Sequence, residues 1–84
     1  MTKYRTIGSE SQIEELAEVA SALSEPHRLR ALALLRNGEA CLCDLTEVLG
    51  LSQSTVSNHM AILRRAGLVE ARKDGRWMHF RLSH

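Results

Sequence analysis

The chain has 84 residues, of which 44% are hydrophobic and 25% are charged, and its formal net charge is +1. This length supports one small domain with a modest core and excludes a second domain. No apolar run approaches the ~20 residues of a membrane span and no signal segment opens the chain, so we expect a cytoplasmic protein without a membrane partner.

The near-neutral total hides an uneven distribution of charge. Residues 1–52 carry five Lys and Arg against eight Asp and Glu, whereas residues 53–84 carry six against two. A basic C-terminal part on a near-neutral protein favours a localised contact with a polyanion, and charge that is merely solvated is the alternative.

The first 38 residues predict a tail and two helices. Residues 1–8 are polar and are interpreted as a flexible tail, so residues 9–84 form the predicted domain. The first helix begins at Ser9 or Ser11, and its apolar face consists of Ile13, Leu16, Ala20 and Leu23. The second helix begins at Ser24, ends at Asn37-Gly38 and is expected to bury Leu29, Leu32 and Leu35.

The next two helices have the spacing of a helix-turn-helix. A short helix opened by Cys41-Leu42-Cys43 ends at Gly50 and is expected to bury Leu42, Leu45, Val48 and Leu49. A fourth helix, capped by Ser52, places Val56, Met60 and Leu63 on one arc, with His59 and Ala66 at its edge. The opposite arc is free of acidic residues and holds Ser54, Ser57, Asn58, Ala61, Arg64 and Arg65. Short polar side chains of this kind allow a helix to lie in a DNA major groove.

The last segment predicts a β-hairpin with a basic tip. Asp74-Gly75 is a two-residue turn signal that pairs Lys73 with Arg76, Ala71 with Met78 and Val69 with Phe80. One face then holds Val69, Ala71, Met78, Phe80 and Leu82, and the other sets Arg72 opposite Trp77 and Glu70 opposite His79. The fold class is therefore mainly α with a β-hairpin wing, a winged helix-turn-helix.

The two cysteines predict a thiol site. A disulfide across one intervening residue closes a tiny, strained loop, so free thiols or ligands are expected. Residues i and i+2 of a regular helix point ~200° apart, but the two sulfurs can converge if Cys41 is the N-cap and Cys43 the second helical residue. A helix N-terminus favours thiolates, and two thiolates suit As(III), Sb(III) or Cu(I). A pair of small core hydrophobes is the alternative, and His27, His59, His79 and His84 are not expected to be ligands.

Three stretches together resemble one known family. They are LSEPHRLRAL at residues 23–32, LSQSTVSNHMAILRRAGLV at residues 51–69 and GRWMHFRL at residues 75–82. Their order and spacing are similar to those of the ArsR/SmtB winged-helix repressors, which sense metals and metalloids. EACLCDL at residues 39–45 is similar to the cysteine box of the arsenite- and cadmium/lead-responsive branches.

The chain departs from the family pattern in three places. The arsenite regulators often have a third cysteine where this chain has Thr46, and the cadmium/lead sensors add N-terminal cysteines that residues 1–40 lack. The chain is also expected to lack the C-terminal helix that helps family members to dimerise and can hold zinc. That zinc site is therefore not carried over.

Together these patterns predict a repressor, not an enzyme, with no catalytic cofactor. It is expected to bind double-stranded operator DNA as a homodimer and to release it when Cys41 and Cys43 capture As(III) or Sb(III). The candidate DNA-binding residues are Gln53, Ser54, Thr55, Ser57, Asn58, Arg64, Arg65, Arg72, Lys73 and Arg76. The alternatives are a redox switch at the same cysteines, a thiol-disulfide enzyme, and an interaction module that no longer binds DNA.

Overall fold

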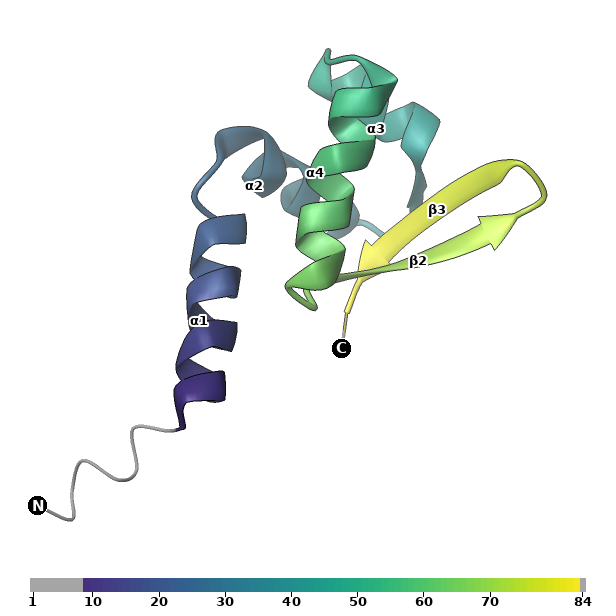
Figure 1. Cartoon of the computed structure of the whole chain (residues 1–84). Coiled ribbons are helices and arrows are strands. Elements are labelled where there is room, and N and C mark those ends of the chain that lie inside the picture. Colours follow the sequence, from purple (N-terminus) through teal and green to yellow (C-terminus); the bar gives the residue numbers. More distant parts are fainter. Residues whose placement is uncertain (1–8, 84) are drawn as a thin grey trace, which may run out of the picture.

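The computed structural model describes residues 9–83, so the predicted tail at residues 1–8 lies outside the described residues. The helices are α1 (Glu10–Ala22), α2 (Pro26–Leu35), α3 (Leu42–Leu49) and α4 (Gln53–Arg65), and the strands are β1 (Ala40–Cys41), β2 (Val69–Asp74) and β3 (Trp77–Leu82). Figure 1 shows α1 extending from the body, α3 and α4 side by side, and β2 and β3 projecting as a wing. The predicted fold class is confirmed. In the described part of the chain no helix is long and apolar enough to cross a membrane.

Local capping sets most of the helix ends. Ser9 begins α1 with a reciprocal capping box to Gln12, and the Ser52 side chain accepts a hydrogen bond from the backbone N–H of Thr55 at the start of α4. Gly50 ends α3 in the left-handed region at φ 69°, where glycine has no steric cost. The predicted start of α2 at Ser24 was wrong by one residue, because the N-cap is Glu25, whose carboxylate accepts from the Arg28 N–H.

The core lies where α2, α3 and α4 meet the strands. Val56, Met60 and Leu63 of α4 are fully buried, as predicted, and they pack with Leu45 and Phe80. Leu29 and Val48, both predicted to be buried, are 49% and 62% exposed. Since residues advance ~100° round a helix, Leu29 lies ~160° from buried Ala31, and Val48 lies ~100° from buried Leu49.

The wing has a register different from the predicted one. Asp74 pairs with Trp77, so Gly75 and Arg76 form the turn, and Arg72 lies opposite His79 instead of Trp77. Gly75 has a φ of +62°, while no residue other than glycine has a positive φ in the described chain. An Asp74-Gly75 turn of type I′ needs two positive φ angles, whereas a turn with glycine first needs one. Because the two registers differ by two residues, the same side chains keep the same face.

A two-residue strand that the sequence did not indicate completes the sheet. Strand β1 pairs antiparallel with β3, and the strand order is β1-β3-β2. Cys41 lies opposite His79 in this pairing. The cysteine segment is therefore hydrogen-bonded directly to the wing.

Candidate functional site

Helix α4 presents the predicted reading face to solvent. Its core side is closed by residues with no exposed surface, and every predicted contact residue of the helix is exposed: Gln53, Ser54, Thr55, Ser57, Asn58, Arg64 and Arg65. The Ser52 hydroxyl donates to Thr55 Oγ1 at 2.8 Å and lies 3.3 Å from Ser54 Oγ. The amino-terminal turn thus holds an ordered set of hydroxyls, and the carboxy-terminal turn carries two guanidinium groups.

The cations of the wing are not equivalent. Lys73 and Arg76 are exposed near the tip, where the Arg76 guanidinium lies 5.6 Å from the centre of the Trp77 ring. Arg72 instead donates two hydrogen bonds to Glu39, from Nη2 to Oε1 at 2.6 Å and from Nε to Oε2 at 3.1 Å. A phosphate contact by Arg72 must therefore compete with Glu39, a residue that sequence reasoning did not single out.

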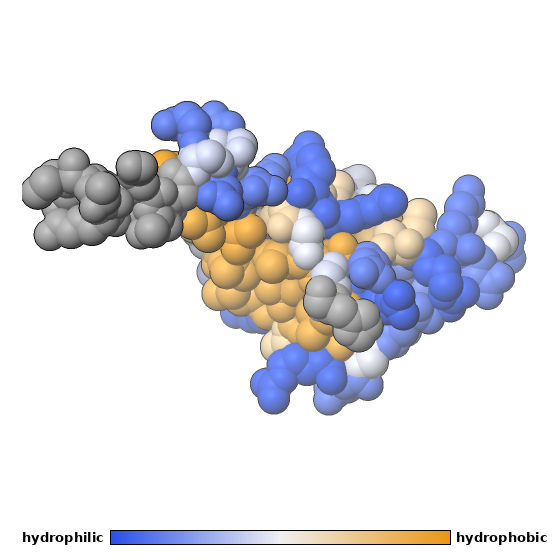
Figure 2. Space-filling view, turned by 90° about the horizontal axis from the view of Figure 1, so that it is seen from below, coloured by the Kyte–Doolittle hydropathy of each residue, from blue (hydrophilic) through white to orange (hydrophobic). Residues whose placement is uncertain are grey.

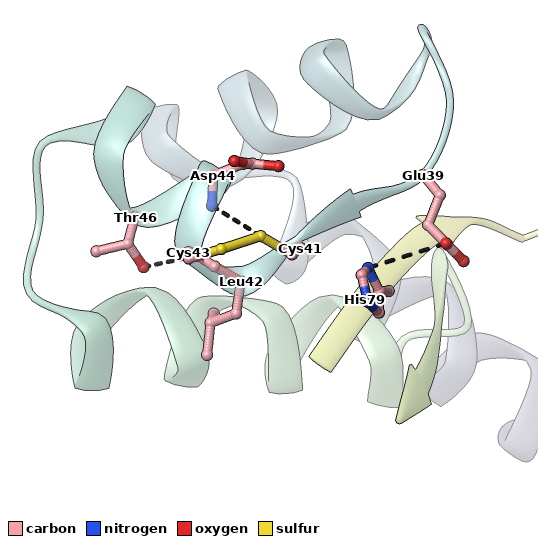
Figure 3. The surroundings of a disulfide bond; sticks show 7 residues. All are labelled: Glu39, Cys41, Leu42, Cys43, Asp44, Thr46 and His79. Carbon is pink, nitrogen blue, oxygen red and sulfur yellow. Dashed lines mark hydrogen bonds and ion pairs between the residues drawn. A yellow bond between two sulfur atoms is a disulfide. The ribbon is translucent and has the colours of Figure 1, made fainter. Parts of the chain in front are cut away.

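Electrostatics support this ion pair. The hydrogen bond from Arg72 is the largest cause that lowers the pKa of the Glu39 carboxyl below its usual value. The same bond raises the pKa of Arg72. Figure 3 shows His79 beside Glu39, with His79 Nδ1 3.9 Å from Glu39 Oε1. Together with Arg72, two residues of the wing therefore contact the segment just before Cys41.

The cysteines occupy the predicted positions at a helix N-terminus. Cys41 is the N-cap of α3, in extended conformation at φ −81° and ψ 161°, and its Sγ accepts a hydrogen bond from the Asp44 N–H at 3.2 Å. The expectation of free thiols was wrong for this structure, since Cys41 and Cys43 form a disulfide (Figure 3). The extended N-cap removes the ~200° divergence of a regular helix, so the two side chains converge with their Cα atoms 5.3 Å apart.

Two neighbours of the cysteines, Thr46 and Asp44, differ in whether they place a ligand atom beside the sulfurs. Thr46, where the resemblance to the arsenite regulators often implies a third cysteine, donates its hydroxyl to the Leu42 carbonyl at 2.8 Å, a bond within α3. The Asp44 carboxylate was not predicted as a ligand, but one of its oxygens lies within 4.8 Å of both sulfurs. The structure therefore places one carboxylate oxygen beside two sulfurs that are joined in a disulfide.

The residue between the cysteines, Leu42, connects them to α4. In Figure 3 the Leu42 side chain points from α3 toward α4. It lines a groove of about 490 Å³ together with Ser57, Ala61, Arg64, Arg65, Ala71, Met78 and Phe80. The cysteine segment thus contacts α4 through Leu42 and the wing through the pairing of β1 with β3.

Comparisons with known proteins agree with this architecture. Residues 25–71 match the profile of the bacterial regulatory proteins of the arsR family. The arsenical resistance operon repressor of Escherichia coli is 47% identical over 62 residues, which cover 73% of this chain and 53% of the repressor. An uncharacterised HTH-type transcriptional regulator of Methanocaldococcus jannaschii is 45% identical over 65 residues, covering 76% of this chain and 73% of that protein.

A solved structure gives the same result for the fold. The homodimeric winged helix-turn-helix DNA-binding domain of a possible ArsR-family regulator from Mycobacterium bovis has a TM-score of 0.84 and 30% identity, and the match covers 92% of this chain and 74% of that one. The chain spans about half the length of several curated relatives, such as the E. coli repressor.

Proposed function

This chain belongs to the bacterial arsR family of regulatory proteins, and on that premise we propose that it is a repressor whose Cys41-x-Cys43 pair senses As(III) or Sb(III). The observation that carries the proposal is the place of Cys41. It is at once the last residue of β1, paired with the wing, and the N-cap of α3, which packs on α4. An ion that binds there acts on both elements of the DNA-binding surface.

The chemistry of capture follows from the donor set. A cellular thiol reductant supplies the two electrons and two protons that convert the disulfide to two thiols, the state expected in a reducing compartment. Arsenous acid then exchanges two hydroxyl groups for two sulfurs and releases two waters, which leaves one position on arsenic. That position keeps its solvent-derived hydroxyl, or a small thiol, a group of a partner subunit or the nearby Asp44 carboxylate replaces the hydroxyl, which leaves with a proton as water.

DNA binding is assigned to the exposed face of α4 and to the wing. Base edges and nearby phosphates are contacted by Gln53, Ser54, Thr55, Ser57 and Asn58, and phosphates or the minor groove by Arg64, Arg65, Arg72, Lys73 and Arg76. In this assignment Arg72 is shared between DNA and Glu39, because its guanidinium already forms a two-bond ion pair. Capture of the ion shifts the equilibrium between DNA-bound and free protein only if the ion favours a position of β1 and α3 that fits DNA poorly.

A homodimer on a palindromic operator is the proposed assembly. Helix α1 buries Ala22 at its carboxy-terminal end, whereas Ile13 and Leu16 are 44% and 66% exposed. Figure 2 shows a continuous apolar area on the underside of the molecule. Exposed apolar area of this kind favours a partner surface, and a second copy satisfies the two-fold symmetry of the operator. The homodimeric relative from M. bovis supports this assembly.

The test is release of DNA by the reduced protein. A labelled duplex bound by wild type should dissociate when As(III) is added, while Cys41→Ser and Cys43→Ser should bind the same duplex and keep it. Serine is an acceptable N-cap and nearly isosteric with cysteine, so folding should survive both changes. Full release from either variant would place the sensor elsewhere.

The disulfide itself favours one second candidate, a redox switch at the same residues. Hydrogen peroxide oxidises two thiols to one disulfide and is reduced to two waters, so no metalloid is needed. Release of DNA by peroxide, but not by As(III), in the same assay would select this candidate.

A further inference from the structure

A second pair of ligand atoms has the same local geometry as the cysteines. Glu25 is the N-cap of α2 and His27 is two residues later, as Cys41 and Cys43 are at α3. Glu25 Oε2 accepts the Arg28 N–H at 3.1 Å, and Glu25 Oε1 lies 3.0 Å from His27 Nδ1. The extended N-cap again folds its side chain over the first turn, so residues i and i+2 present their ligand atoms together.

A third ligand atom reaches this pair from the reading helix. His59 lies on α4 with its Nε2 3.8 Å from Glu25 Oε2, and its ring stacks on that of His27 with centroids 6.0 Å apart. One ligand atom from each of Glu25, His27 and His59 lies within 4.8 Å of the others. The side chains of Glu25, His27 and His59 are 29%, 32% and 14% exposed, so all three are partly buried.

The chemistry of these atoms fits a borderline divalent cation. Two imidazoles and one carboxylate are a known Zn²⁺ ligand set, and they leave a fourth position for water. Bonds of about 2.0–2.2 Å in tetrahedral geometry put ligand atoms about 3.3 Å apart, so small side-chain rotations suffice. We propose that Glu25, His27 and His59 form a Zn²⁺ site that is separate from the thiol pair and ties α2 to the reading helix. The expectation that these histidines are not ligands is revised by this proposal.

A hydrogen bond between Arg28 and His59 depends on whether the proposed site holds a metal ion. Its Nη1 lies 3.1 Å from His59 Nδ1, and because a guanidinium can only donate, Nδ1 accepts and Nε2 carries the ring proton. Binding of a cation at Nε2 moves that proton to Nδ1, which can no longer accept from Arg28. Arg28 keeps its hydrogen bonds to the carbonyl oxygens of Ala22 and Ser21. Only its hydrogen bond to His59 of α4 is lost, and the metal ion then joins α2 to α4 in its place.

Cobalt is the suitable probe, because Co²⁺ in a tetrahedral nitrogen and oxygen site has visible absorption that Zn²⁺ then abolishes by displacement. The background is the full chain with Cys41→Ser and Cys43→Ser, so that no thiol competes. His27→Gln removes one ligand from a partly exposed position, and folding of the variant is checked by circular dichroism. His79→Gln is the matched control, since it removes a histidine from the wing, away from the cluster.

The background protein should bind one Co²⁺ per chain, and His27→Gln should weaken that binding at least tenfold, as loss of even an outer-shell partner does. His79→Gln should leave the affinity unchanged. No saturable absorption, equal binding by His27→Gln, or equal loss in His79→Gln would overturn the proposal. Because the thiols are absent from every protein in this test, its result is independent of whether the cysteines sense As(III).

Discussion

The two exposed cations at the wing tip should set a measurable part of the salt dependence of DNA binding. Lys73 and Arg76 are exposed, whereas Arg72 is held by Glu39. Each phosphate contact contributes about 0.9 to the slope of log affinity against log salt concentration, so Lys73→Gln with Arg76→Gln should flatten the slope by about 1.8 per protomer. Between about 50 and 200 mM salt this difference is about twelvefold per protomer and about 150-fold for a dimer.

The assay is fluorescence anisotropy of a labelled duplex over a series of salt concentrations. Arg30→Gln with Arg36→Gln is the control, because it removes the same charge from exposed positions of α2 and its C-cap. Arg72→Gln alone should flatten the slope less than Lys73→Gln alone, since a phosphate must first displace the Glu39 carboxylate. An unchanged slope in the wing variant, or an equal change in the control, would refute the assignment of the wing to DNA.

Three further predictions concern the reading face, the ion pair and the core. Replacing Asn58 or Ser54 by Ala should cost about 1–3 kcal/mol on the cognate duplex and little on unrelated DNA, measured by competition; equal losses on both would misplace the reading face. The lowered pKa of Glu39 contributes stability that is present above its usual value of 4.5 and is lost as the pH falls through the lowered value. Glu39→Gln should therefore destabilise the protein at neutral pH and progressively less in acid. Urea unfolding at several pH values measures this, and a loss of stability that does not depend on pH would contradict it. Leu45→Ala should cost about 2–5 kcal/mol of unfolding free energy, because Leu45 is 1% exposed, and a loss below that range would remove Leu45 from the core.

The features that the sequence predicted well depend on neighbouring residues. Ser9, Ser52 and Gly50 begin or end helices through bonds and backbone angles within a few residues of themselves, so their type and position suffice. The buried arc of α4 and the N-cap role of Cys41 were predictable for the same reason. The predicted burial of Leu29 was wrong. Leucines spaced three residues apart do not stay on one face of a helix, so Leu29 lies away from the face that α2 buries.

The features that escaped prediction join distant parts of the chain. Strand β1 exists only through its pairing with β3, and Glu39 meets Arg72 across 33 positions of sequence. The ring of His59 meets Arg28 across 31 positions, and nothing near either residue indicates that contact. The wing register was ambiguous because two registers two residues apart bury the same side chains, and the backbone at Gly75 decides between them.

Arsenic X-ray absorption of the reduced chain tests the central claim most directly. With a phosphine as the reductant, the only sulfur ligands available to As(III) come from the protein. Wild type should show two sulfurs around each bound arsenic, and Cys41→Ser and Cys43→Ser should each show at most one. Arsenic without sulfur neighbours in wild type, or two sulfurs in either variant, would contradict the account.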